Sequence, residues 1–172
     1  MTRLPRRTVL GLLLATPAAA HTPYQQWVVY RRKHLLLGCH RGDAAGYALA
    51  KRAAEELAAH LPKSRARVAR APGPARIASL LATDQLDLAV LDTETAQAMA
   101  AGDGTFAAYG KQQLATLALF DGDRALLAHP RFPERHASLV AETLIGSGLA
   151  PREVQHTPPL PWHKEALVLL GE

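Results

Sequence analysis

The stretch LLLGCHRGDAAGYALA, residues 35–50, decides the fold of this chain. An apolar run from Leu35 to Leu37 ends at a glycine, and a polar turn from Cys39 to Asp43 then leads into an alanine-rich segment. A short apolar run bounded by a turn predicts a buried strand, and the alanine-rich segment predicts a helix. Two further alternations of strand and helix follow as far as Gly102. We therefore expect an α/β fold with a doubly wound, mainly parallel sheet, which binds ligands at the carboxyl ends of its strands.

The rest of the pattern predicts one domain over residues 35–150. Strands are expected at 64–71, 87–91, 114–120 and 124–129, and helices at 44–61, 75–82, 93–102 and 134–145. The sequence Asp121-Gly122-Asp123 between the last two strands is typical of a hairpin turn. In the first helix, residues Ala45, Leu49, Ala53 and Leu57 are predicted to face the core.

The amino-terminal residues predict export. Arg3, Arg6 and Arg7 precede an apolar run from Val9 to Leu14, and three alanines end at Ala20. This pattern indicates a signal peptide over residues 1–20, by the twin-arginine or the general secretory route, and a periplasmic protein. The apolar run is shorter than the roughly 20 residues of a membrane-spanning helix, so no span is expected after cleavage.

Two segments flank the predicted domain. Residues 21–34 form an arm that carries Tyr24, Trp27 and Tyr30, and residues 151–172 form a proline-rich tail that is expected to wrap the surface. Those three aromatic residues and Trp162 are candidate anchors for a protein partner.

The net charge and the single cysteine bear on nucleic-acid binding and on disulfide formation. The formal net charge of +5 includes three leader arginines, and without them 17 basic residues face 15 acidic ones. This near balance does not indicate nucleic-acid binding, and the cluster Arg65, Arg67 and Arg70 is interpreted as a charged sheet edge. The single cysteine, Cys39, cannot form a disulfide within the chain and is expected to be buried, although it also belongs to a predicted ligand turn.

Several segments resemble the first lobe of the TAXI solute receptors, which serve TRAP transporters. The resemblance rests on residues 35–38, 48–50 and 72–81 and, above all, on LLATDQLDLAVL at 80–91; residues 114–130 and 159–166 are also similar. It implies half of a type II periplasmic-binding-protein fold and a solute-binding function in uptake or sensing. The chain passes from His129 to its last predicted helix within a few residues, so the second lobe of such a receptor is expected to be absent.

The predicted site lies where three turns should meet at one edge of the sheet. Each turn leads into a helix amino terminus, where free N–H groups and the helix dipole favour anions, and arginines in two of the turns add positive charge. We expect a small anionic solute as the ligand and no cofactor. The candidate ligand-binding residues are Cys39, His40, Arg41, Gly42, Asp43, Gly73, Arg76, Asp92 and Thr93.

Other functions stay open as alternatives. The chain is alternatively an accessory or assembly subunit that binds a periplasmic protein, as a homo- or hetero-oligomer, through the face that the second lobe would cover. A histidine exposed by cleavage, His21, is a weaker alternative as a copper ligand, and no metal site is predicted from spacing. The chain has no nucleophile elbow, zinc-protease, phosphate-loop or dinucleotide motif, so an enzyme is not expected.

Overall fold

The computed structural model describes residues 30, 32–120, 123–152 and 157–171. The predicted signal peptide and most of the aromatic arm, Tyr24 and Trp27 included, lie outside the described residues, as does His21. Within the described residues, the helices are all too short or too polar to cross a membrane.

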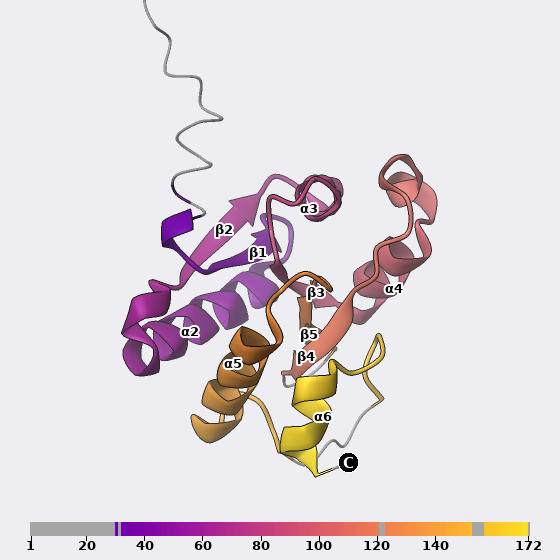
Figure 1. Ribbon diagram of the computed structural model, residues 1–172. Helices are drawn as coiled ribbons and strands as arrows, with labels where there is room; N and C mark the ends of the chain where they lie inside the picture. The colour runs from indigo at the N-terminus through magenta and orange to yellow at the C-terminus, as the bar shows by residue number, and fades with distance from the viewer. Residues whose placement is uncertain (1–29, 31, 121–122, 153–156, 172) are drawn as a thin grey trace, which may run out of the picture.

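Within the described residues, five strands form one sheet at the centre of the domain (Figure 1). The strands are β1 (Leu36–His40), β2 (Arg67–Ala71), β3 (Leu88–Asp92), β4 (Ala115–Leu119) and β5 (Arg124–Ala128), in the order β2-β1-β3-β5-β4. β1 pairs in parallel with β2 and with β3, whereas β5 pairs antiparallel with β3 and with β4. The α/β prediction is thus confirmed, but the sheet is mixed, with a parallel half and an antiparallel half.

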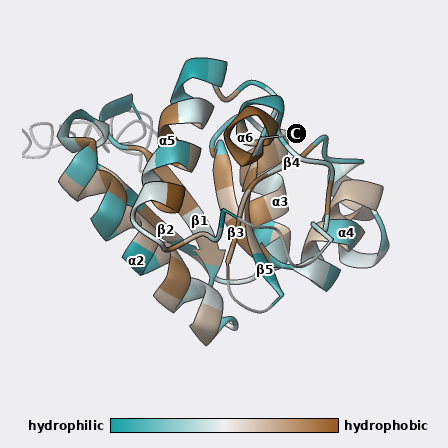
Figure 2. Cartoon of the chain, turned by 90° about the horizontal axis from the view of Figure 1, so that it is seen from below, coloured by the Kyte–Doolittle hydropathy of each residue, from teal (hydrophilic) through white to brown (hydrophobic). Residues whose placement is uncertain are grey.

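Helices cover both faces of the sheet (Figure 1). The described helices are α2 (Ala44–His60), α3 (Pro74–Ala82), α4 (Thr93–Ala101), α5 (Glu134–Gly146) and α6 (Lys164–Leu170), with short 3-10 turns at Pro62–Ser64 and Gly104–Tyr109. α2, α5 and α6 pack on one face, and α3 and α4 pack on the other. Figure 2 shows that the sheet between these layers is largely hydrophobic.

The alternation of side chains along each strand divides the core between the two faces. Leu37 and Cys39 of β1 pack against α2, while Leu36 packs on the α3 side. In β3, Leu88 and Val90 belong to the first layer, and its other two apolar residues belong to the second. A central strand such as β3 is buried on both faces, which explains its nearly continuous apolar sequence, whereas the edge strand β2 carries two arginines.

The carboxyl-terminal segment differs from the predicted tail. Instead of wrapping the surface as a proline-rich extension, it forms a bridge between Trp162 and Thr116 and then the helix α6, which packs on α5. The Thr116 hydroxyl donates to the Leu160 carbonyl over 2.8 Å, and the His163 N–H donates to the Thr116 carbonyl over 2.8 Å. The segment therefore covers the outer edge of β4. The sequence prediction missed α6 because its seven residues follow three closely spaced prolines and carry an almost unbroken apolar run without a polar face.

Candidate functional site

The three predicted turns lie at the carboxyl ends of adjacent strands. β1 is between β2 and β3, and all three run in the same direction, so the segments after His40, Ala71 and Asp92 share one edge of the sheet. The Arg41 N–H donates to the Ala71 carbonyl over 2.9 Å, which fixes the first turn against the second. We refer to this edge, with the end of β1 and the turn after it at 40–43 and with the segments 72–76 and 92–95, as the carboxyl edge.

A buried ion pair lies at the centre of the carboxyl edge. Asp43, only 7% exposed, begins α2, and its Oδ1 accepts the Gly46 N–H over 2.9 Å. Arg124, at the start of β5, donates its Nη2 to Asp43 Oδ1 over 2.8 Å and its Nε to both carboxylate oxygens over 3.1 Å. This fork-to-carboxylate geometry orders the Asp43 turn and connects the parallel half of the sheet to the antiparallel half.

The ion pair sets the charge state of Asp43. Burial alone would raise the pKa of this carboxyl, but the hydrogen bonds from Arg124 and from the Gly46 N–H outweigh it and lower the pKa. The pKa of Arg124 is raised, chiefly by its hydrogen bond to Asp43. Both groups are consequently charged at neutral pH.

Asp92 repeats the arrangement of Asp43 at the next strand end. It begins α4, and its Oδ1 accepts the Thr95 N–H over 2.8 Å. Thr93 is tied to the hairpin, because its N–H and hydroxyl both donate to the Asp123 carbonyl, over 2.8 and 3.0 Å. The amino termini of α2 and α4 are therefore already capped by carboxylates of the chain itself.

The amino terminus of α3 is different. It begins at Gly73 and Pro74, and no side chain caps it. Arg76, in the first turn of α3, donates only to Ser79 among the described residues, over 3.3 Å. A shallow pocket of about 210 Å³ lies here, lined by Arg76 and Leu80 of α3 and by residues 69–72.

The charges divide the carboxyl edge into two halves. Arg41, Arg70 and Arg76 lie over the ends of β1 and β2, and none of them forms an ion pair with a described residue. Arg70 instead lies over the Tyr47 ring, 4.4 Å from its centroid. Toward β3 and β5, three carboxylates surround the single guanidinium of Arg124; they belong to Asp43, Asp92 and Asp123. The first half is cationic and the second half is acidic.

The remaining predicted residues contribute unequally. Gly42 is exposed in the first turn, and the His40 ring is half-buried near the Asp43 carboxylate. Cys39 is fully buried against α2, and burial raises the pKa of its thiol, so this side chain does not reach the carboxyl edge.

Arg124 is the residue of the site that sequence reasoning missed. Its position follows from the antiparallel pairing of β5 with β3, in which Arg124 is the register partner of Asp92. The hairpin signal before it predicted two successive strands, but the sequence did not indicate that β5 would pair with β3. Recognising that pairing would have placed the start of β5 at the carboxyl edge.

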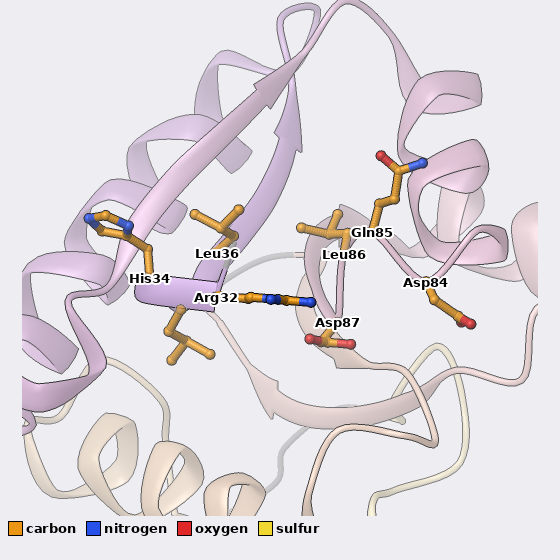
Figure 3. Close-up of a pocket in the computed structure, with 8 residues that line it drawn as sticks. Arg32, His34, Leu36, Asp84, Gln85, Leu86 and Asp87 are labelled. Carbon is orange, nitrogen blue, oxygen red and sulfur yellow. The ribbon is translucent and has the colours of Figure 1, made fainter. Parts of the chain in front are cut away.

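A second pocket of about 210 Å³ lies at the opposite edge of the sheet, near the amino ends of β1 and β3 (Figure 3). It is lined by Leu35 and Leu36, by residues 84–87, and by Arg32, whose side chain points toward Asp87 in Figure 3. Arg131 bonds to the Asp87 carboxylate and the Leu86 carbonyl over 2.7 Å each and also pairs with Asp84. This pocket contains none of the predicted ligand residues.

Comparison of the chain with protein-family models, curated proteins and solved structures finds no match. The resemblance to TAXI receptors therefore rests on the sequence segments alone.

Proposed function

We propose that this chain is an exported protein that binds a small anionic solute at the cationic half of its carboxyl edge. The observation that carries the proposal is the meeting of two arginine-bearing turns beside the one uncapped helix start among α2, α3 and α4. The hydrogen bond from the Arg41 N–H to Ala71 holds the turns together. Export and a role in uptake or sensing rest on the sequence of residues 1–20 and on the family resemblance.

The chemistry of this half suits a carboxylate or a phosphate. The start of α3 carries the positive end of the helix dipole, and no side-chain oxygen of the described chain competes for its N–H groups. The guanidinium groups of Arg41 and Arg76 are available for charge-assisted hydrogen bonds. An anion is directed to α3 rather than to α2 or α4, because Asp43 and Asp92 occupy the starts of those helices.

The shape of the edge predicts weak binding by this chain alone. The pocket beside α3 is shallow, whereas sites that enclose most of a ligand give high affinity. We therefore expect a dissociation constant in the range from about 10 μM to 1 mM, which corresponds to roughly 4 to 7 kcal/mol of binding free energy.

Isothermal titration tests the proposal with inorganic phosphate, acetate, succinate and glutamate as probes. The wild-type chain should bind at least one of them, and Arg41→Ala and Arg76→Ala should each weaken that binding about tenfold, as expected for the loss of a charge-assisted hydrogen bond. Arg52→Ala, which removes an exposed arginine from the middle of α2, should leave it unchanged. Absence of binding to all four probes, or equal binding by the three variants, would contradict the proposal.

One observation favours a protein partner, but on α5 and α6, which cover one face of the sheet, and not over the strand ends where the partner is predicted. Leu139 of α5 and Val168 of α6, on two helices that pack together, are 39% and 73% exposed. Figure 2 shows α6 as strongly hydrophobic. Of the predicted anchors, Trp162 instead packs against the core, and Tyr30 stacks on His34 with ring centroids 4.2 Å apart. If the accessory role is correct, Val168→Glu should abolish an oligomer or complex seen by analytical ultracentrifugation, and a monomeric wild-type chain that binds one of the probes would exclude it.

A further inference from the structure

The acidic half of the carboxyl edge holds a second cluster of chemistry-bearing side chains. His40 at the end of β1, Asp43 at the start of α2 and Asp92 at the end of β3 each offer one ligand atom, and these atoms all lie within 4.8 Å of one another. We propose that they form a site for a divalent transition-metal ion of the zinc class. This site is separate from the anion site at α3 and does not depend on a bound solute.

The ligand types favour such an ion over magnesium or calcium. Zinc-class ions bind imidazole nitrogen and carboxylate oxygen at about 2.0–2.2 Å, whereas Mg²⁺ and Ca²⁺ prefer an all-oxygen set. Ligands of a tetrahedral site with such bonds lie about 3.4 Å apart. The present ligand atoms lie within 4.8 Å of one another, so binding requires them to move closer together. The His40 ring is the part that can move, because it forms no hydrogen bond with a described residue, whereas both carboxylates are held by backbone N–H groups.

The two carboxylates are oriented as metal ligands are. In each, Oδ1 is held by a backbone N–H of the following helix, from Gly46 to Asp43 and from Thr95 to Asp92. Arg124 further fixes Asp43 through three hydrogen bonds. Hydrogen bonds of this kind fix the direction of a ligating carboxylate. Asp43 Oδ2 accepts only one of them, from Arg124 Nε, so this oxygen rather than Oδ1 would bind the ion. Asp92 Oδ2 accepts no hydrogen bond from a described residue and remains available to an ion.

The local charge also favours a cation. Asp43, Asp92 and Asp123 carry three negative charges, and Arg124 supplies one positive charge. These four side chains together have an excess of two negative charges, which a divalent ion would neutralise. Three protein ligands leave a fourth position for water, as in open zinc sites.

The experiment is a titration of the untagged, demetallated chain with Co²⁺, followed by visible absorption and by isothermal titration, and then with Zn²⁺ in competition. We expect one ion per chain and an absorption spectrum of four- or five-coordinate cobalt that Zn²⁺ abolishes. His40→Ala and Asp92→Asn should each weaken binding at least tenfold. Asn at position 92 keeps the oxygen that caps α4, so this variant separates the loss of a ligand from the loss of the fold.

Matched controls identify the source of any binding. His136→Ala removes an exposed histidine from α5 and should bind Co²⁺ within about twofold of the wild type. His21→Ala should behave in the same way, since the proposed site does not use the amino terminus. Circular dichroism checks that each variant folds. Absence of stoichiometric binding by the wild type, or equal binding by His40→Ala and Asp92→Asn when both are folded, would overturn the proposal.

Discussion

Replacement of Arg124 by glutamine tests whether the buried ion pair holds the carboxyl edge together. The substitution removes the three hydrogen bonds of 2.8–3.1 Å to Asp43 and leaves a carboxylate that is 7% exposed beside a helix start. Breaking a buried ion pair costs about 3–5 kcal/mol, and the partial exposure of the Arg124 side chain, at 23%, places this pair at the lower end. We therefore expect a loss of about 3 kcal/mol in the free energy of unfolding.

Urea denaturation measures this loss directly. With a denaturant slope of about 2 kcal/mol per molar for a domain of this size, the midpoint should fall by about 1.5 M. The double variant with Asp43→Asn should recover part of the loss, because no unpaired charge then stays buried. Arg52→Ala, on the exposed side of α2, serves as the control and should change the midpoint little.

The pH dependence of the unfolding free energy provides a second test of the ion pair. The pKa of Asp43 is lowered in the folded chain, so its contribution to stability is present above the unfolded pKa of about 3.9 and is lost as the pH falls through the folded pKa. The gap between the wild type and Arg124→Gln should therefore narrow at acidic pH, below that unfolded value. An unfolding free energy of Arg124→Gln within about 0.5 kcal/mol of the wild type at neutral pH, which is the range of an ordinary surface substitution, would refute the structural role of the pair.

Three further predictions concern single sites. Gly46→Ala should lower the stability of the fold, because the added Cβ would overlap Asp43 Oδ2. Alanine is otherwise about 1 kcal/mol more favourable than glycine in a helix interior. A raised melting temperature would therefore contradict the capping of α2 by Asp43. Burial lowers the pKa of the His163 imidazole, which caps α6, so the unfolding free energy should fall as the pH drops below about 6.5. In His163→Asn this decrease, measured by urea denaturation above and below that pH, should be smaller than in the wild type. Leu57→Ala, in the fully buried part of α2, should cost about 2–5 kcal/mol by the same assay, and a cost below about 1 kcal/mol would contradict its place in the core.

The parallel half of the fold follows closely from local sequence signals. The proline that follows α2 and the cap at Asp92 with Gly102 at the end of α4 lie where the pattern predicts them, because each signal acts within a few residues. The predicted end of β1 is wrong: the strand continues past Gly38 to His40, so Cys39 and His40 pair with β2 instead of belonging to the turn.

The set of α2 residues that face the core is predicted less well. Ala45 is exposed, whereas Gly46 and Ala50 are buried, since an alanine-rich helix has little contrast between its faces and tertiary packing decides its rotation.

The antiparallel half and the site depend on pairings that no local signal specifies. The hairpin prediction requires only that β4 and β5 pair with each other, and it leaves open which of them joins β3. The choice of β5 brings Arg124 to Asp43, 81 positions earlier in the chain. Long-range contacts of this kind are determined by the packing of the whole sheet, so the sequence predicts the turns of the site but not the residue that joins them.

The most direct test of the anion site is the mapping of amide signals by NMR while inorganic phosphate or succinate is added to the isotope-labelled chain. We expect saturable shifts confined to the turn at 41–43, to residues 72–73 and to the first turn of α3, and in Arg76→Ala the same shifts should need about tenfold more ligand to saturate. Saturable shifts that map to the pocket at the amino ends of β1 and β3, or no saturable shifts with either probe, would contradict an anion site at the carboxyl edge.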